Sequence, residues 1–270
     1  MKKKIPQSIV AFTLLLMCSF VQSQTAKVEV RDDFKKHFQE NHVQGSFVLY
    51  DLRKDQWILI GPKQRKTAFT PASTFKICNS LIGLETGVVR DENFVIRWDG
   101  ITRSNPEWNK DHDLKSAFKN STVWYYQELA RRVGGERMKK WLDLVGYGNA
   151  DTSGGIDRFW LSGGLRITPE QQIIFLRRLF LGDLPFSKRT MDIVRKIMIV
   201  KDTTTYTLRA KTGWGAQDGL DIGWYVGYVQ TKSGVYFFAT CAQRPQSDNP
   251  DFLKARIDIT LSILKELKLI

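Results

Sequence analysis

Strand-like segments lie at both ends of this sequence, and helix-like segments fill the part between them. Ser46 to Asp51 and Gln56 to Ile60 are short apolar runs separated by charged turn residues, a pattern that predicts a β-hairpin. Alternating β-branched and aromatic runs return after residue 203, at Thr205 to Lys211, Ile222 to Thr231 and Val235 to Gln243. Strands at both ends can bury their apolar faces together. We therefore expect an α/β protein of the α+β kind: one antiparallel sheet flanked by helices, with a helical lobe inserted at roughly residues 90–200.

The remaining segments show the apolar spacing of helices. Predicted helices cover 29–41, 73–86, Leu114 to Lys119, Val123 to Val133, Glu136 to Val145, Pro169 to Leu181, Lys188 to Ile199 and 250–268. No repeated unit and no linker interrupts the chain, which disfavours solenoids and separate domains. We expect a single domain over residues 24–270.

The first 23 residues have the pattern of a secretory signal peptide. A basic start at Lys2-Lys3-Lys4 precedes the mostly apolar run Ile9 to Val21, and Val21-Gln22-Ser23 offers small residues for cleavage after Ser23. An alternative is lipoprotein maturation at Cys18. No apolar stretch reaches the about 18 residues of a membrane span. The pattern predicts a secreted or periplasmic protein without stable membrane insertion after cleavage.

Charge and residue types exclude several function classes. The formal net charge of +13 falls to +10 without the three early lysines, and the basic residues are scattered rather than gathered in blocks. We therefore expect no nucleic-acid partner. The three histidines form neither H-E-x-x-H nor a pair at metal-ligand spacing, and C-x-x-C is absent, so we expect no metal. The sequence leaves open whether Cys78 and Cys241 are bridged.

Without G-x-S-x-G, the remaining common base for a serine nucleophile is a lysine. The pattern S-x-x-K places both side chains on one helical face. It occurs at Ser73–Lys76, Ser116–Lys119 and Ser262–Lys265. Three matches in one chain show that the bare pattern is weak, and its context must decide.

Context favours Ser73. It follows Pro71-Ala72 at the start of a predicted buried helix, where backbone N–H groups stabilise developing negative charge. Ser121-Thr122-Val123, Tyr147-Gly148-Asn149 and Lys211-Thr212-Gly213 follow in that order. Each tripeptide alone is typical of a helix cap or a turn. Together, with Lys-Thr-Gly in the last block of strands, they indicate Ser73 and Lys76 as the reactive pair.

The ordered set S-x-x-K, S-x-V, Y-G-N and K-T-G resembles the class D, or oxacillinase-type, serine β-lactamases. The related set with S-D-N belongs to class A enzymes and penicillin-binding proteins, so Val123 favours class D. Similar segments cover essentially the whole mature chain: Arg97 to Gly100, Trp108 to Ser121, Trp160-Leu161 and Ile222 to Gly227. The resemblance implies a β-lactamase/penicillin-binding-protein-like fold.

The resemblance also implies a reaction, the hydrolysis of penicillin-type antibiotics, which gives antibiotic resistance. Small-molecule β-lactams would be the partners. No cofactor is implied beyond carbon dioxide or bicarbonate, consumed reversibly. Ser73 would attack the β-lactam carbonyl, and Lys76, modified to N6-carboxylysine, would be the general base. Val123 would give that carbamate an apolar wall, and the indole N–H of Trp160 would hold it.

Further roles follow from the resemblance. Ser121 would relay a proton to the β-lactam nitrogen. Lys211, Thr212, Trp214 and Arg256 would bind substrate, and the backbone N–H groups of Ser73 and Trp214 would form the oxyanion hole. Tyr147-Gly148-Asn149 would shape the loop beside Trp160.

Two alternatives share the Ser–Lys chemistry. One is a D-alanyl-D-alanine peptidase or penicillin-binding protein, and the other is a β-lactam receptor domain that stays acylated. The Ser-x-Val motif argues against the first, and the lack of further membrane segments argues against the second. The sequence leaves open the oligomeric state and the breadth of the substrate spectrum, which depends on the loop from Gly215 to Asp221.

Overall fold

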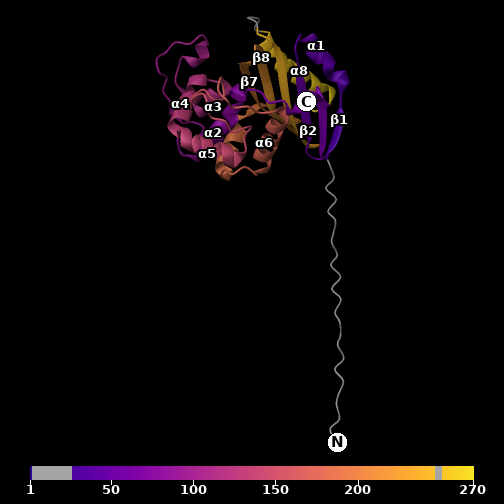
Figure 1. The fold of residues 1–270 in the computed structure, drawn as a ribbon, viewed down its shortest axis with the longest axis horizontal. Coiled ribbons are helices and arrows are strands. Elements are labelled where there is room, and N and C mark those ends of the chain that lie inside the picture. Colours follow the sequence, from indigo (N-terminus) through magenta and orange to yellow (C-terminus); the bar gives the residue numbers. More distant parts are fainter. Residues whose placement is uncertain (2–25, 247–250) are drawn as a thin grey trace.

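A seven-stranded sheet forms the centre of the part of the chain that the structure describes, residues 1, 26–246 and 251–270 (Figure 1). The structure is a computed structural model. The strand order of the seven-stranded sheet is β1-β3-β2-β9-β8-β7-β6. The strands are β1 (Lys27–Val30), β2 (Gln44–Asp51), β3 (Gln56–Ile60), β6 (Ile199–Asp202), β7 (Tyr206–Gln217), β8 (Leu220–Thr231) and β9 (Val235–Pro245). The predicted cleavage site after Ser23 lies outside the described residues.

Helices cover both faces of this sheet. They are α1 (Lys35–Glu40), α2 (Lys76–Glu85), α3 (Leu114–Lys119), α4 (Val123–Val133), α5 (Gly135–Val145), α6 (Pro169–Leu181), α7 (Lys188–Ile197) and α8 (Phe252–Glu266). The helices α2 to α6 gather on one side, whereas α1 and α8 lie together on the other (Figure 1). A two-stranded ribbon, β4 (Val95–Ile96) with β5 (His112–Asp113), belongs to the helical side. Within the described residues, no helix is long and apolar enough to cross a membrane.

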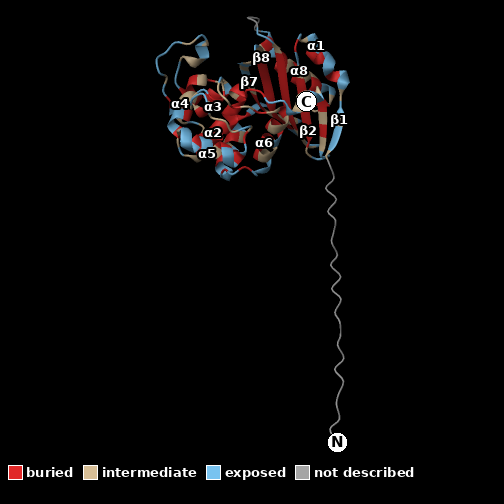
Figure 2. Ribbon diagram, in the orientation of Figure 1, coloured by how far each residue is buried: buried red, intermediate tan, exposed pale blue. Residues whose placement is uncertain are grey.

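The central strands of the sheet, β2, β9 and β8, are buried on both faces, as their red colour in Figure 2 shows. Alternate residues of a strand point to opposite faces. Phe47 and Leu49 of β2 pack with α1 and α8, whereas Val48 and Tyr50 pack with the helical lobe. This double burial explains why β2 and β8 are almost continuously apolar in the sequence.

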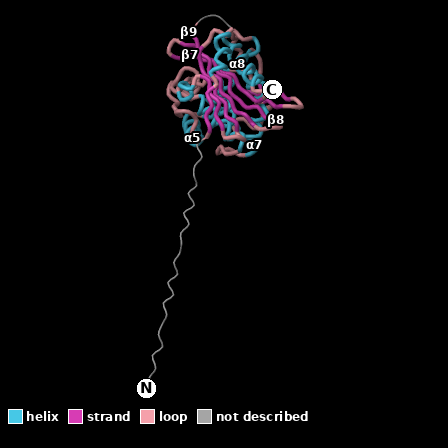
Figure 3. The backbone as a smooth tube through the Cα atoms, turned by 90° about the vertical axis from the view of Figure 1, so that its right-hand side faces the viewer, coloured by secondary structure: helices cyan, strands magenta, loops and turns pink. Residues whose placement is uncertain are grey.

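The two ends of the chain meet in the middle of the sheet. Strand β2 pairs with β9, so that Phe47 lies opposite Thr240, and the hairpin β2–β3 completes this side. Figure 3 shows the strands side by side. The predicted sheet with helices on its faces is confirmed, including the hairpin and the bounds of α3, α4 and α6.

Two short edge strands correct the sequence-based prediction. Residues 27–30, which overlap the helix predicted at 29–41, form β1, and β1 runs parallel to β3. The sheet is therefore mixed rather than purely antiparallel. Helix α7 ends at Ile197 because residues from Ile199 turn into β6, which pairs with β7. Both β1 and β6 are held by hydrogen bonds to a neighbouring strand. Apolar periodicity in the sequence cannot predict strands that are defined by such pairing.

Candidate active site

Ser73 lies on a short 3-10 helix, η3 (Ala72–Phe75), that leads directly into α2. The sequence predicts one continuous helix over 73–86, so the first turn is tighter than expected. This turn places Ser73 beside Lys76, whose Nζ donates a hydrogen bond to Ser73 Oγ at 2.7 Å. Ser73 is half-buried, whereas Lys76 has no exposed surface. The predicted nucleophile is therefore hydrogen-bonded to a fully buried lysine.

Burial makes Lys76 an unusual lysine. Removal from water, with the nearby charge of Lys211 as a smaller cause, places the pKa of Lys76 well below its ordinary value. The ring of Tyr126 lies below the amine, with its centroid 5.3 Å from Nζ. Burial therefore favours the neutral amine of Lys76 over the ammonium form, and a neutral amine is a nucleophile and a base.

Trp160 adds an unpaired donor to this buried region. Its ring centroid lies 5.3 Å from that of Phe75, the residue directly before Lys76 in the sequence. Trp160 has no exposed surface, and its Nε1 has no hydrogen-bond partner among the described residues. Val123, at the first position of α4, is half-buried. A buried N–H without an acceptor costs about 1–3 kcal/mol, which makes this position suited to an acceptor group that binds there.

A second hydroxyl–amine pair is formed by Ser121 and Lys211. Lys211 Nζ donates to Ser121 Oγ at 3.1 Å and to Thr212 Oγ1 at 3.3 Å. Ser121 connects α3 to α4 in a left-handed conformation, with φ of 54°, which is uncommon for a residue other than glycine. Burial, and then the charge of Arg256, lowers the pKa of Lys211 to about 7. Its charge is therefore sensitive to pH in the physiological range.

The Lys-Thr-Gly segment borders Ser73 along a free strand edge. Strand β6 pairs with residues 207–209 of β7, and within the described residues no further strand pairs with that edge of β7 beyond residue 209. A Cβ on Gly213 would lie 2.9 Å from the carbonyl oxygen of Pro71 and 3.3 Å from the backbone nitrogen of Thr74. Glycine at 213 therefore allows β7 to rest against η3. Trp214, the next residue, is 54% exposed and donates its indole N–H to Asp221 at 3.0 Å.

Arg256 approaches from α8. It is only 7% exposed, and its Nε and Nη1 atoms have no hydrogen-bond partner in the described part of the chain. Burial lowers its pKa to about 10. The charge of Arg256 acts on Lys211, and that of Lys211 acts on Lys76, so the three basic side chains lie near one another. Such a cluster attracts an anionic ligand.

The Tyr-Gly-Asn segment holds the loop that follows Trp160. The Asn149 side chain accepts from the backbone N–H of Arg166 at 2.9 Å and donates to the carbonyl of Gly164 at 3.0 Å. Gly148 has a φ of +56°, and a Cβ there would lie 2.1 Å from the Arg166 carbonyl oxygen. These contacts agree with the loop-shaping role expected for the motif.

The other two S-x-x-K serines lie in different surroundings. Ser116 forms a reciprocal capping box with Asp113 at the start of α3, which accounts for its presence by local structure. Ser262 lies within α8, and no hydrogen bond joins it to Lys265. Among the three S-x-x-K matches, the lysine donates a hydrogen bond to the serine oxygen at Ser73.

The sequence analysis missed residues that support the site from behind. Tyr126 lies one helical turn after Val123, and this i, i+3 spacing could have indicated it. Gln217 accepts a hydrogen bond from the backbone N–H of Thr70 at 2.8 Å and so fixes the strand end to the approach to Ser73. No pattern in the sequence could indicate that contact. Cys78 and Cys241 are both buried and free.

Comparisons with known proteins place these observations in a family. The model of the penicillin-binding protein transpeptidase domain matches residues 35–265. The chain is 46% identical to β-lactamase OXA-48 of Klebsiella pneumoniae over 234 residues, 87% of each chain. It is 45% identical to the probable β-lactamase YbxI of Bacillus subtilis, over 91% of this chain and 86% of the relative.

Solved structures agree. The crystal structure of the class D β-lactamase YbXI from Nostoc has a TM-score of 0.85 at 46% identity and covers 89% of this chain and 100% of that chain. The class D β-lactamase from Sebaldella termitidis has a TM-score of 0.86 at 40% identity, with 90% and 99% covered. The chain therefore belongs to the penicillin-binding protein transpeptidase family. Within that family it is a class D serine β-lactamase, an enzyme that hydrolyses β-lactam antibiotics.

Proposed function

We propose that this enzyme opens the β-lactam ring of penicillin-type antibiotics through an acyl-enzyme on Ser73, with N-carboxylated Lys76 as the general base. The observation that carries the proposal is the hydrogen bond of 2.7 Å between Lys76 Nζ and Ser73 Oγ, made by a lysine with no exposed surface. A serine beside a lysine of depressed pKa is an activated nucleophile. Ser73 attacks the carbonyl carbon of the lactam, and the C–N bond of the ring breaks.

The surroundings of Lys76 fit a carboxyl group on its amine. Burial disfavours the protonated form of the amine, and only a neutral amine adds carbon dioxide. Trp160 Nε1 is a buried donor without a partner among the described residues. Val123 contributes an apolar side chain at the start of α4. When present, a carbamate on Lys76 would supply a carboxylate base for the Ser73 proton and for the water that ends the cycle.

The remaining polar groups have roles in binding and proton transfer. Ser121, hydrogen-bonded to Lys211, passes a proton to the leaving β-lactam nitrogen. The backbone N–H groups of Ser73 and Trp214 bind the carbonyl oxygen as it gains charge. Arg256, with Lys211 and Thr212 nearby, binds the substrate carboxylate, because its unpartnered guanidinium donors are already buried.

Turnover kinetics test this proposal against the two alternatives. When a chromogenic cephalosporin is present in molar excess over the enzyme, product continues to form only if the acyl-enzyme is hydrolysed. A single burst of one equivalent would instead indicate a slow peptidase or a receptor that stays acylated. Loss of the continuous phase in Ser73→Ala assigns the turnover to this serine.

We further propose that the mature enzyme is a single catalytic domain, residues 24–270, secreted or held in the periplasm. The signal-peptide pattern of residues 1–23 supports this placement. Mass spectrometry of the exported protein tests it. A new N-terminus at Gln24 is expected, whereas a lipid-modified Cys18 would show lipoprotein maturation.

A further inference from the structure

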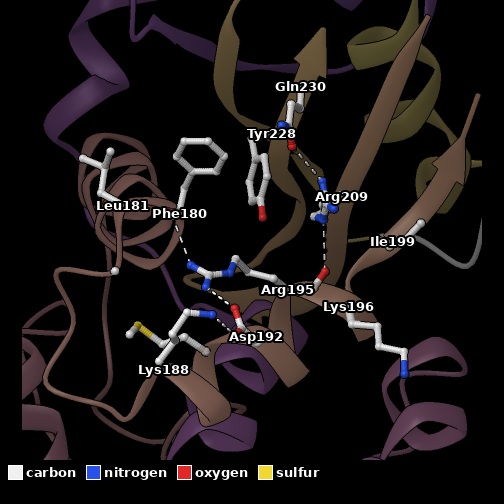
Figure 4. A pocket seen from close by; sticks show the side chains of 12 residues that line it. Phe180, Leu181, Lys188, Asp192, Arg195, Lys196, Ile199, Arg209, Tyr228 and Gln230 are labelled. Atoms are coloured by element: carbon white, nitrogen blue, oxygen red, sulfur yellow. Dashed lines mark hydrogen bonds and ion pairs between the residues drawn. The ribbon is translucent and has the colours of Figure 1, made fainter. Parts of the chain in front are cut away.

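A cavity of about 750 Å³ lies away from Ser73, between the end of α6, the helix α7 and the strands β6 to β8 (Figure 4). It shares no residue with the candidate active site. Its wall includes Phe180, Met191, Arg195, Arg209 and Tyr228. The volume is in the range of pockets that hold small organic ligands.

Tyr228 presents an unpaired hydroxyl to this cavity. The residue has no exposed surface, and its Oη has no hydrogen-bond partner among the described residues. Figure 4 shows this oxygen directed into the space between Phe180, Arg195 and Arg209. Burial raises the pKa of Tyr228 to about 12, so the hydroxyl is a neutral donor at physiological pH. A buried donor aimed into a cavity favours an acceptor on a ligand.

The residues that line the cavity include more cations than anions. The lining contains Lys188, Arg195, Lys196 and Arg209 but one carboxylate, that of Asp192. Asp192 pairs with both Lys188 and Arg195, and Lys196 pairs with Glu92 at 2.8 Å. These carboxylates do not balance all four cations, and the cavity keeps a net positive charge beside Arg209. Arg209 donates through Nε to the Arg195 carbonyl at 3.1 Å and through Nη1 to Gln230 at 3.3 Å. Its Nη2 group makes no hydrogen bond to a described residue.

An apolar wall adjoins the Tyr228 side chain. The ring of Phe180 meets that of Tyr228 edge-on, with centroids 5.5 Å apart. Met191 and Leu181 extend this surface. The cavity therefore combines a flat aromatic wall with a positive end that carries free donors.

We propose that this cavity is a binding site for a small organic carboxylate with a flat apolar body. The carboxylate accepts hydrogen bonds from Tyr228 Oη and Arg209, while the apolar body lies against Phe180. Such a site is separate from the catalytic one, since a ligand here touches neither Ser73 nor Arg256.

Calorimetric titration with 2-naphthoate tests the proposal. Tyr228→Phe keeps the ring and removes only the hydroxyl, so affinity is expected to fall about tenfold or more, as for a hydrogen bond to a charged group. Arg209→Gln keeps a side-chain amide for Arg195 and Gln230 but removes the charge, and should weaken binding similarly. Neutral 2-naphthamide is expected to bind much more weakly than the acid. Turnover of a chromogenic cephalosporin by Tyr228→Phe should stay near that of the parent enzyme and report its folding.

Arg256→Ala separates this cavity from the catalytic cleft, which also attracts carboxylates. Naphthoate binding should survive Arg256→Ala if the ligand lies beside Tyr228. Loss of binding in Arg256→Ala with no loss in Tyr228→Phe would place the ligand at the active site and overturn the proposal. An absence of measurable binding to the parent enzyme at millimolar naphthoate would overturn it as well.

Discussion

Lys211 Nζ lies 3.1 Å from Ser121 Oγ, although the two residues are 90 positions apart in the chain. The contact joins the sheet to the helical lobe at the catalytic cleft. The charge of Lys211 is adjustable, because burial and Arg256 bring its pKa to about 7. Changes at Arg256 should therefore act on substrate binding and on the pH profile together.

Arg256→Ala is expected to raise KM for β-lactams that carry a carboxylate by about 10- to 100-fold, which corresponds to about 1.5–3 kcal/mol for a charge-assisted hydrogen bond. Loss of the neighbouring charge also raises the pKa of Lys211 above 7, so Lys211 stays protonated to higher pH. The alkaline limb of the pH profile of kcat/KM should shift to higher pH. Steady-state kinetics across pH measure both effects, and Arg256→Lys is the charge-keeping control. An unchanged KM would remove Arg256 from the binding site.

Ser73→Ala should abolish hydrolysis, whereas Ser116→Ala and Ser262→Ala should keep most of it. Of these three serines, Ser73 is the one whose S-x-x-K lysine is buried and donates a hydrogen bond to the serine oxygen. Ser116→Ala removes the Ser116 half of the capping box at α3 and keeps the Asp113 cap, so it should lower stability by no more than about 1 kcal/mol without touching the nucleophile. Turnover and thermal unfolding of the three variants check this. A folded Ser116 or Ser262 variant without activity would contradict the assignment.

Activity should depend on carbon dioxide if Lys76 is carboxylated. Degassed enzyme is expected to slow, and added bicarbonate should restore it. Acidification should lower activity, because the pKa of Lys76 is depressed and only the unprotonated amine, favoured above that pKa, forms a carbamate. A carbon-13 spectrum in labelled bicarbonate should show the carbamate. Full turnover after thorough degassing, with no such resonance, would favour an ordinary neutral lysine base.

Trp160→Phe keeps an apolar ring and removes the unpaired indole N–H. Deacylation should be impaired more than acylation, so that acyl-enzyme accumulates and mass spectrometry detects it during turnover. Excess bicarbonate should restore part of the rate. Equal loss in both steps, or none, would exclude a carbamate-holding role for Trp160.

Gly213→Ala should impair catalysis by moving β7 away from η3. The added Cβ would lie 2.9 Å from the Pro71 carbonyl oxygen, closer than real Cβ contacts allow. A matched control is Gly135→Ala at the start of α5, where a Cβ meets nothing within 4 Å. That control should keep activity and gain up to about 1 kcal/mol in stability. Similar activity for the two variants would contradict the close fit at Gly213.

Local patterns predicted the elements whose ends are fixed by their own residues. Helix α6 begins at Pro169 because Thr168 and Gln171 form a capping box, which involves only neighbours in sequence. Strands β1 and β6 are different, since each is exposed and takes its hydrogen bonds from one partner strand. Their positions depend on the folded sheet, and no periodicity in the sequence shows them.

The contacts of the candidate site also fall into two groups: those that local sequence predicts and those that depend on the packing of the whole fold. The spacing of Ser73 and Lys76 suffices to place them together, because i, i+3 residues are neighbours on a helical turn. The approach of Lys211 to Ser121, and of Gln217 to Thr70, depends on how the sheet packs against the lobe. The resemblance of the ordered motifs to a family indicated the first of these, and nothing in the sequence indicated the second.

The pairing of β2 with β9 has a consequence for how the molecule assembles. Phe47 reaches its neighbour Thr240 only after nearly the whole chain is available. Contacts between residues so distant in sequence close slowly, because a long loop must be ordered before they form. A ribosome-bound fragment that lacks β9 leaves one long edge of β2 unpaired. The catalytic cleft is therefore a late product of folding, and a chain shortened before β9 should show no partial activity.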